Sequence, residues 1–305
     1  MERLVRYFTE GIENRPIANT IGVEVETSFM MEHENGSPIT VAQSQLLIER
    51  FRRVKDWRIT KTKGNLIAEI SDGANKLSYE LGRQNLELSI APDTNSAVAV
   101  SRAMKLADEL GSVASYVSDP DARFLWEVSE PIIHTNEDLL MIPDERDATW
   151  LELDGRPALE LLARTSAVQF TISVSLKDAI ECLNRLGEKI GSFLKDYPQE
   201  ENWRRYIKES KADYHAMRYG GPLFFDSIED YCKKLIKHNV VVGPELVPYN
   251  QVRDLDIPLY LRSIWWYFRL RRYENTLCIE VRPLPRRDSR KFKEQFDFVM
   301  NIMQS

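Results

Sequence analysis

The chain has 305 residues, of which 43% are hydrophobic and 29% are charged, a composition typical of a globular protein with a substantial core. Its 41 basic and 47 acidic residues are well mixed and give a formal net charge of -6, which disfavours nucleic acid or anionic lipid as a partner. No segment reaches the roughly 20 apolar residues needed to cross a membrane, and no Ser/Gly- or Pro-rich spacer divides the chain. We therefore expect one domain over residues 1–305 and no membrane partner.

The N-terminus and the cysteines predict a cytoplasmic protein. Residues 1–15 are charged throughout and lack the apolar stretch of a secretory signal peptide. Cys182, Cys232 and Cys278 are widely spaced and include no CxxC pair, as expected for reduced thiols that pack in a core.

Two kinds of periodicity follow one another along the chain. Apolar residues at three- and four-residue steps predict helices, and alternating apolar and polar residues predict strands. In chain order we expect a strand at 21–28, a helix at 41–54, strands at 66–70, 76–79 and 86–90, a helix at 95–117, a strand at 167–175, helices at 178–196, 200–211, 227–238 and 257–272, a strand at 276–282 and a helix at 288–303. Because helices and strands do not alternate strictly, the pattern favours an α+β fold with a mainly antiparallel sheet.

Four of the predicted strands have one apolar and one polar face. In the first, Ile21, Val23 and Val25 lie opposite Glu24 and Glu26, since side chains alternate along a strand. The other three have polar faces that contain Glu87 and Ser89; Gln169, Thr171, Ser173 and Ser175; and Cys278, Glu280 and Arg282. A sheet covered by helices on one side and solvated on the other would explain this alternation in each strand taken alone.

The glutamates on these faces favour a metal site over a merely solvated sheet. Glutamate is a poor strand former, and Glu24 and Glu26 repel each other unless a cation lies between them. Mg²⁺ prefers oxygen ligands and takes one or two protein carboxylates together with nucleotide phosphates. Several glutamates on one sheet face could therefore hold such ions around a triphosphate.

Four segments carry a resemblance to a known family. The run from Tyr79 to Pro92, YELGRQNLELSIAP, resembles the hallmark of glutamate–cysteine ligases, in which a glutamate precedes a glycine turn and a Glu-Leu-Ser strand ends near Ala-Pro. The other landmarks follow in that family's order. GVEVE at 22–26 resembles its G-x-E-x-E strand, RTSAVQ at 164–169 its R-T-x-x-x-[QH] strand, and 260–283 its C-terminal helix and E-x-R strand. The resemblance covers about residues 20–285.

The resemblance implies a glutamine synthetase-like fold, in which a curved antiparallel sheet forms an open funnel with helices on its convex side. It implies that ATP and Mg²⁺ bind on the concave face. The implied metal ligands, matched position by position, are Glu24, Glu26, Glu80, Glu87, Gln169 and Glu280. Arg269 and Arg282 would be catalytic and would face the nucleotide phosphates, with Gln169 also in the cofactor site.

Three further residues are candidates for binding substrate. Arg164 opens the R-T-x-x-x-[QH] segment, and Arg218 and Tyr219 precede the loop Gly220-Gly221-Pro222. This loop could lie over the substrate, although a structural turn explains it more readily.

The implied reaction transfers the ATP γ-phosphoryl group to a substrate carboxylate, and an amine then displaces phosphate from the acyl phosphate. The acid would be glutamate, through its γ-carboxyl group, and the amine cysteine or another amine. The chain lacks G-x-x-x-x-G-K-[ST] and G-x-G-x-x-G loops, so metals would hold the nucleotide. Two alternatives to this carboxylate–amine ligase are a phosphotransferase of the same fold and a non-catalytic protein that binds Mg²⁺-ATP.

Overall fold

The computed structural model describes residues 1–31, 38–80, 82–115, 124–126, 163–195, 219–242, 245–262 and 264–305, together with a few isolated residues between 148 and 160. The helix expected at 200–211 and the candidate residue Arg218 lie outside these ranges. No helix within them is long and apolar enough to cross a membrane.

Nine strands of the described residues form one sheet, in the order β12-β13-β7-β1-β5-β4-β3-β2, with β6 paired to β1. Every neighbouring pair is antiparallel. The strands are β1 (Ile21–Met31), β2 (Arg58–Lys63), β3 (Leu66–Ser71), β4 (Lys76–Tyr79), β5 (Asn85–Asp93), β6 (Phe124–Trp126), β7 (Val168–Ser173), β12 (Phe268–Tyr273) and β13 (Thr276–Val281). The α+β prediction and all six predicted strands are confirmed.

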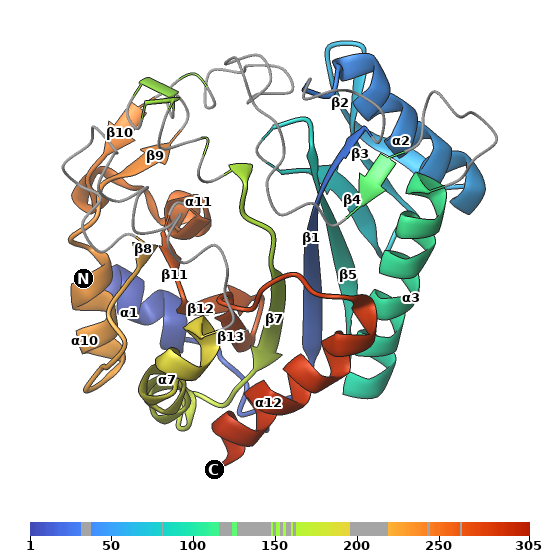
Figure 1. Cartoon of the computed structure of the whole chain (residues 1–305). Helices are drawn as coiled ribbons and strands as arrows, with labels where there is room; N and C mark the ends of the chain where they lie inside the picture. The colour runs from blue at the N-terminus through green and yellow to red at the C-terminus, as the bar shows by residue number, and fades with distance from the viewer. Residues whose placement is uncertain are drawn as a thin grey trace.

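Helices cover the convex, apolar face of this sheet. Figure 1 shows α3 beside β1 and β5, α7 beside β12 and β13, and α12 between α7 and α3. The helices are α1 (Glu2–Thr9), α2 (Val41–Lys55), α3 (Ser96–Ala114), α7 (Ala179–Glu188), α8 (Ile190–Leu194), α10 (Ile228–Leu235), α11 (Ile257–Arg262) and α12 (Phe292–Gln304). The remaining short strands are β8 (Tyr219–Gly220), β9 (Val240–Val242), β10 (Glu245–Val247) and β11 (Trp265–Trp266).

The apolar halves of the strands form the core beneath these helices. Val23, Val25 and Ile279 are each at most 1% exposed. Phe170 on β7 meets Phe296 on α12 edge to face, with ring centroids 5.4 Å apart. Because the apolar side chains of these strands pack against the helices, the polar side chains of the same strands lie on the opposite, concave face.

Local capping chemistry fixes the start of α2. The Thr40 hydroxyl accepts a hydrogen bond from the Gln43 N–H at 3.2 Å, and the Gln43 side chain accepts one from the Thr40 N–H at 2.8 Å. This reciprocal pair is a capping box, which satisfies two backbone donors at the helix start.

The prediction of one helix over residues 257–272 is wrong. Helix α11 ends at Arg262, and the chain continues through β11 into β12, which pairs with β13. The run Phe268-Arg269-Leu270-Arg271 also alternates with a period of two, and the hairpin turn at Glu274, with φ of 53°, sets it against β13. Arg269 and Arg271 therefore lie on a strand, and Trp265 and Trp266 are not helical.

Smaller differences concern elements that the sequence patterns left out. The helix expected at 178–196 is divided at Lys189 into α7 and α8. Helix α1, edge strand β2 and the short strands β6, β8, β9, β10 and β11 were not predicted. Strands of two or three residues are too short to show a periodicity.

Candidate active site

The pairing of β1 with β5 brings two glutamates face to face. Glu26 is the direct antiparallel partner of Glu87, and Glu24 is the partner of Ser89 on β5 and of Gln169 on β7. All of them lie on the concave face, because side chains alternate along β1 and the intervening valines are buried. The register thus concentrates carboxylates that come from separate strands.

Glu80 joins this pair from the turn that follows β4. Gly82 in that turn has φ of 88°, a left-handed conformation that favours glycine, and the Glu80 N–H donates to the Asn85 carbonyl oxygen at 3.1 Å. Carboxylate oxygens of Glu26, Glu80 and Glu87 all lie within 4.8 Å of one another. Three converging carboxylates fit a hard divalent cation such as Mg²⁺.

On their own, these carboxylates hold protons more tightly than usual. Burial, reinforced by Glu87 and Glu24 against the attraction of Arg282, raises the pKa of Glu26 to about 8. Burial and then repulsion by Glu87 raise the pKa of Glu24 to about 8 as well. A bound cation would offset both the repulsion between the carboxylates and the cost of burying their negative charges.

The carboxyl groups of Glu80 and Glu87 lie close enough to hydrogen bond, so their titrations are coupled. Burial and the neighbouring Glu80 raise the pKa of Glu87 well above its usual range. Glu80 is the exposed member of the group, yet the protein around its carboxyl group and the charge of Glu26 raise its pKa to about 7.

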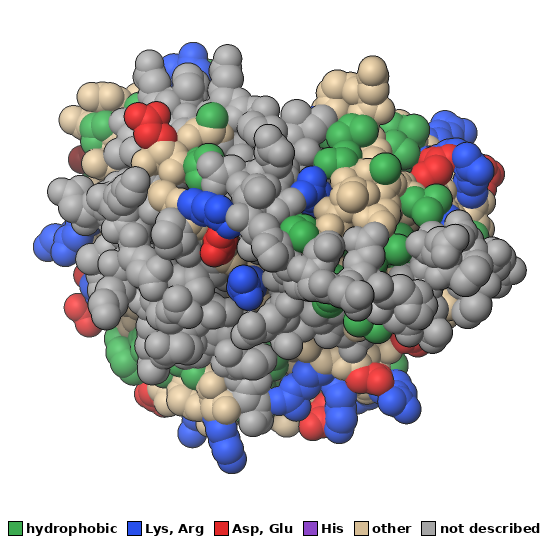
Figure 2. Space-filling model, turned by 45° about the horizontal axis from the view of Figure 1, so that its top comes forward, with side chains coloured by type: hydrophobic (Ala, Val, Ile, Leu, Met, Phe, Trp, Pro, Cys, Tyr) green, Lys and Arg blue, Asp and Glu red, His purple; other side chains and the backbone are tan. Residues whose placement is uncertain are grey.

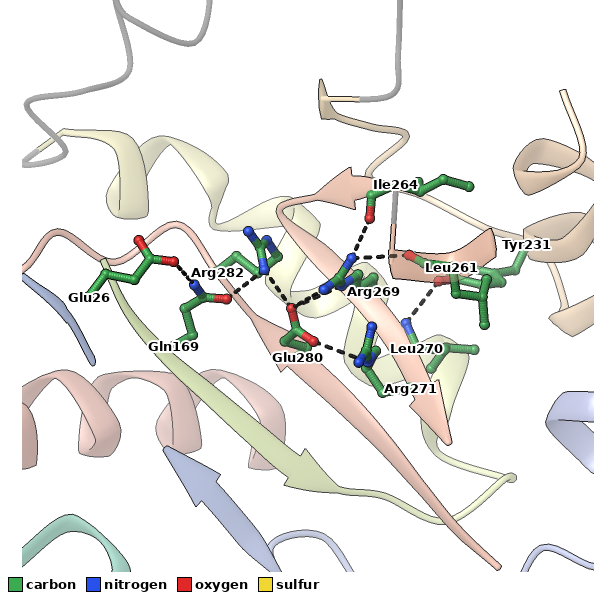
Figure 3. A network of polar contacts seen from close by, with 10 residues as sticks. All are labelled: Glu26, Gln169, Tyr231, Leu261, Ile264, Arg269, Leu270, Arg271, Glu280 and Arg282. Carbon is green, nitrogen blue, oxygen red and sulfur yellow. Dashed lines mark hydrogen bonds and ion pairs between the residues drawn. The ribbon is translucent and has the colours of Figure 1, made fainter. Parts of the chain in front are cut away.

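A chain of hydrogen bonds connects this acidic group to a group of arginines (Figure 3). Gln169 Nε2 donates to Glu26 Oε1 at 2.5 Å, and Gln169 Oε1 accepts from Arg282 Nη1 at 2.6 Å. The same Nη1 donates to Glu280 Oε1 at 2.7 Å. Glu26 Oε2 also accepts from the Ala167 N–H at 3.1 Å, so both oxygens of Glu26 are held in place.

Glu280 sits at the other end of this chain, among three guanidinium groups. Its Oε1 lies 2.7 Å from Arg269 Nη2 and 2.7 Å from Arg282 Nη1, and its Oε2 lies 3.3 Å from Arg271 Nε. Burial alone would raise the pKa of Glu280, but the three guanidiniums, Arg269 foremost, outweigh it and hold that pKa far below its usual range. Burial lowers the pKa of Arg269 to about 10, which still leaves it protonated at neutral pH.

The structure brings together only part of the predicted metal-ligand set. Three of the six residues form the convergent group, and Glu24 and Gln169 flank it on β1 and β7. Glu280 lies apart from this group, with both carboxylate oxygens bound by guanidiniums. Its role as a metal ligand stays a prediction, and it would require these ion pairs to rearrange.

The two predicted catalytic arginines differ in their surroundings. The Arg269 side chain is 9% exposed, and beyond Glu280 its Nη1 donates to the carbonyl oxygens of Leu261 and Ile264. Arg282 lies between the acidic and basic groups and contacts both through Gln169 and Glu280. Arg282 is therefore the better placed of the two to face a ligand.

The predicted substrate-binding residues are not brought together by the described contacts. Arg164 is half-buried and precedes β7. The backbone of Tyr219 pairs with Trp265 where β8 runs parallel to β11. Arg218 lies outside the described residues, so these three assignments stay predictions.

Arg271 is a site residue that was not among the candidates predicted from sequence. It lies two positions from Arg269 on the same face of β12 and contacts Glu280. The alternation of Phe268 and Leu270 with the two arginines was the signal that could have found it, because a strand places both arginines on one face.

An acidic and a basic group thus lie next to each other on one sheet face. Figure 2 shows basic and acidic side chains beside one another near the middle of the face turned forward. Such an arrangement can bind a divalent cation together with an oxyanion such as phosphate or carboxylate.

No protein-family model and no curated protein matches the chain. Among solved structures, a bifunctional glutathione synthetase from Pasteurella multocida has a TM-score of 0.49 and 10% identity over 93% of this chain and 38% of its own, too low a similarity to support an argument. A glutamate–cysteine ligase from Francisella tularensis in complex with AMP has a TM-score of 0.51 and 12% identity over 96% of this chain and 68% of its own. This second similarity shows that the chain has the fold of a glutamate–cysteine ligase, in agreement with the predicted fold class.

Proposed function

We propose that the protein is an ATP- and Mg²⁺-dependent carboxylate–amine ligase. The observation that carries the proposal is the convergence of Glu26, Glu80 and Glu87 beside three arginines that share Glu280. Phosphoryl transfer to a carboxylate brings several anionic groups together, and it needs cations and guanidiniums at the place where charge develops.

The acidic group would hold Mg²⁺, and the arginines would face the phosphates of ATP. Mg²⁺ bound there would neutralise charge on the transferred phosphoryl group. Glu26 is already oriented for this by Gln169 and the Ala167 N–H, and Arg282 is oriented by Gln169 and Glu280. The substrate carboxylate would become an acyl phosphate, which an amine then attacks, so no nucleophilic side chain is needed.

The fold similarity supports the nucleotide and the leading acid. The Francisella tularensis protein is a glutamate–cysteine ligase that was determined with AMP. We therefore propose ATP as the phosphoryl donor and glutamate as the first acid to test, with cysteine or another small amine as the acceptor. We also propose that residues 1–305 form one catalytic domain.

A hydroxylamine trap tests this function without knowledge of the amine. Purified protein, Mg²⁺, ATP, hydroxylamine and a panel of carboxylic acids that includes glutamate should yield hydroxamate and ADP with one acid. Glu87→Gln should abolish the product, whereas Glu69→Gln, a change on the same sheet face outside the convergent group, should not. A stable phosphorylated product without hydroxamate would indicate a phosphotransferase. ATP binding without any product would favour the non-catalytic alternative.

A further inference from the structure

Strand β12 places Arg271 on the concave face beside small residues. Its direct partner on β13 is Cys278, whose own partner on β7 is Ser173. The next residue along β12, Arg272, points to the opposite face, where it donates to the carbonyl oxygens of Glu274 and Tyr7. The cross-strand neighbours of Arg271 are therefore too short to cover its guanidinium.

Arg269 and Arg271 differ in how many of their guanidinium nitrogens have a partner and in how exposed they are. Arg269 bonds to Glu280 through two nitrogens and to two backbone carbonyls through the third. Arg271 has a longer contact with Glu280, 3.3 Å from its Nε, and a hydrogen bond to Tyr273. The Arg271 side chain is also 18% exposed, against 9% for Arg269.

Charge balance favours an anion at the same place. Three guanidiniums surround the carboxylate of Glu280, which is 2% exposed, and Glu24 is a second carboxylate whose charge acts on Arg271, so positive groups still outnumber negative ones. A partly desolvated cation needs a compensating charge or hydrogen-bond acceptor, and the planar fork of arginine suits the two oxygens of a phosphate or carboxylate. Of the three, Arg271 combines the weakest contact to Glu280 with the greatest exposure.

We propose that Arg271 binds an oxyanion of a substrate, either a phosphate group of the nucleotide or a carboxylate of the acid. This inference rests on the proposed function of the site and adds a ligand contact to it. The Arg271 guanidinium lies over the ring of Tyr273, 5.8 Å from the ring centroid, and this contact helps to orient it.

The test compares Arg271→Gln and Arg271→Lys with the control Arg272→Gln, from the opposite face of the same strand. Calorimetric titrations of each folded variant use MgATP, inorganic phosphate and glutamate as probes. Loss of one charge-assisted contact should weaken binding of at least one probe by roughly 10- to 100-fold in Arg271→Gln. Arg271→Lys, which keeps the charge but not the fork, should lose less.

The probe affected identifies the source of the oxyanion. Weaker binding of MgATP and phosphate points to the nucleotide, and weaker binding of glutamate alone points to the acid. Should Arg271→Gln fail to fold, Arg271→Lys supplies the comparison. Unchanged affinities for all probes, or a wild-type protein that binds none of them, would overturn the inference. Oxyanion binding that depends on Arg271 without any hydroxamate formation would contradict the ligase and leave this inference standing.

Discussion

Glu26 and Glu87 are direct partners across strands β1 and β5, and Glu80 brings a third carboxylate within 4.8 Å of both. Like charges directly opposite each other weaken a β-sheet. The arrangement is therefore costly for the sheet by itself and becomes favourable when a divalent cation lies between the carboxylates. This relationship makes the metal dependence of stability and of activity two readouts of the same residues.

Glu87→Gln should change both readouts together. The pKa of Glu87 is raised well above its usual range, so without metal the change replaces a neutral carboxyl group by a neutral amide of the same shape, and we expect the metal-free protein to keep its stability at pH 8. The stabilisation by Mg²⁺ should disappear, and Mg²⁺-dependent ADP release should fall by roughly two orders of magnitude or more. Thermal unfolding with and without Mg²⁺, together with steady-state ADP release, measures both effects.

Glu69→Gln is the matched control for that variant. Glu69 lies on β3, where it pairs with Ser78, and its carboxylate accepts a hydrogen bond from Thr60 at 2.7 Å. It shares the sheet but not the convergent group of carboxylates. Equal losses of Mg²⁺ response in Glu69→Gln and Glu87→Gln would count against a metal site at Glu87.

The raised pKa values predict how stability changes with pH. The pKa of Glu24 and of Glu26 is about 8 in the folded protein, whereas an unperturbed glutamate, as in the unfolded chain, has a pKa of 4.5. Between pH 4.5 and 8 the folded state therefore binds more protons than the unfolded state. The free energy of unfolding of the metal-free protein should therefore be highest near pH 4.5 and fall as the pH rises towards 8. The slope should be on the order of 1 kcal/mol per pH unit for each group.

Denaturant titrations from pH 5.5 to 8.5, with EDTA or with Mg²⁺, measure this slope. Mg²⁺ should flatten the decline, because a bound cation favours the ionised carboxylates. The pKa of Glu280 is displaced in the opposite direction, so its contribution is lost only in strong acid and does not interfere in this range. Stability that rises from pH 5.5 to 8 without metal would contradict the prediction.

We expect the main role of Arg269 to be the stabilisation of the fold. Its guanidinium ties Glu280 on β13 to the backbone between α11 and β11. Arg269→Gln would leave Glu280 without the most buried of its three partners, and breaking a buried pair costs about 3–5 kcal/mol. Chemical denaturation should show a loss of this order, larger than that for Arg271→Gln. An Arg269→Gln protein with wild-type stability would refute this structural role.

The faces of the strands could be predicted from sequence because alternation is a local property. Alternation alone assigned the glutamates, the glutamine and the arginine to the correct face of their strands, without knowledge of the strand pairing. The strands concerned were predicted at 21–28, 86–90, 167–175 and 276–282. The resemblance at Tyr79 to Pro92 added Glu80, which lies in a turn and has no periodicity of its own.

Long-range pairing could not be predicted in the same way. The run from Ile257 to Arg272 satisfies both a helical and a strand period in part, and its hairpin with β13 decides between them. Arg269 and Arg271 reach Glu280 through that hairpin, so their ion pairs with Glu280 could not be predicted from the sequence. No local pattern indicates that a carboxylate will be neutralised by residues eleven positions before it, as Arg269 does for Glu280.

Two roles for Gln169, a metal ligand or a hydrogen-bonded bridge between Glu26 and Arg282, predict opposite effects of the same substitution on Mg²⁺ affinity. Its Oε1, the atom that would bind a cation, accepts from Arg282, and its Nε2 holds Glu26. If Gln169 is a bridge, Gln169→Glu should lower Mg²⁺ affinity by roughly 10- to 100-fold, since Glu26 loses its donor and faces a further carboxylate. Gln169→Met, which removes both bonds without adding charge, should lower it as well.

A direct ligand would respond differently to the same pair of variants. A carboxylate is a stronger ligand for Mg²⁺ than an amide oxygen, so Gln169→Glu would then raise the affinity while Gln169→Met lowered it. Calorimetric titration of Mg²⁺ into the three proteins, with unfolding temperatures to confirm that each is folded, separates the two roles. We expect both variants to weaken binding, because the hydrogen bonds of Gln169 to Glu26 and Arg282 keep the acidic and basic groups apart and each in its orientation.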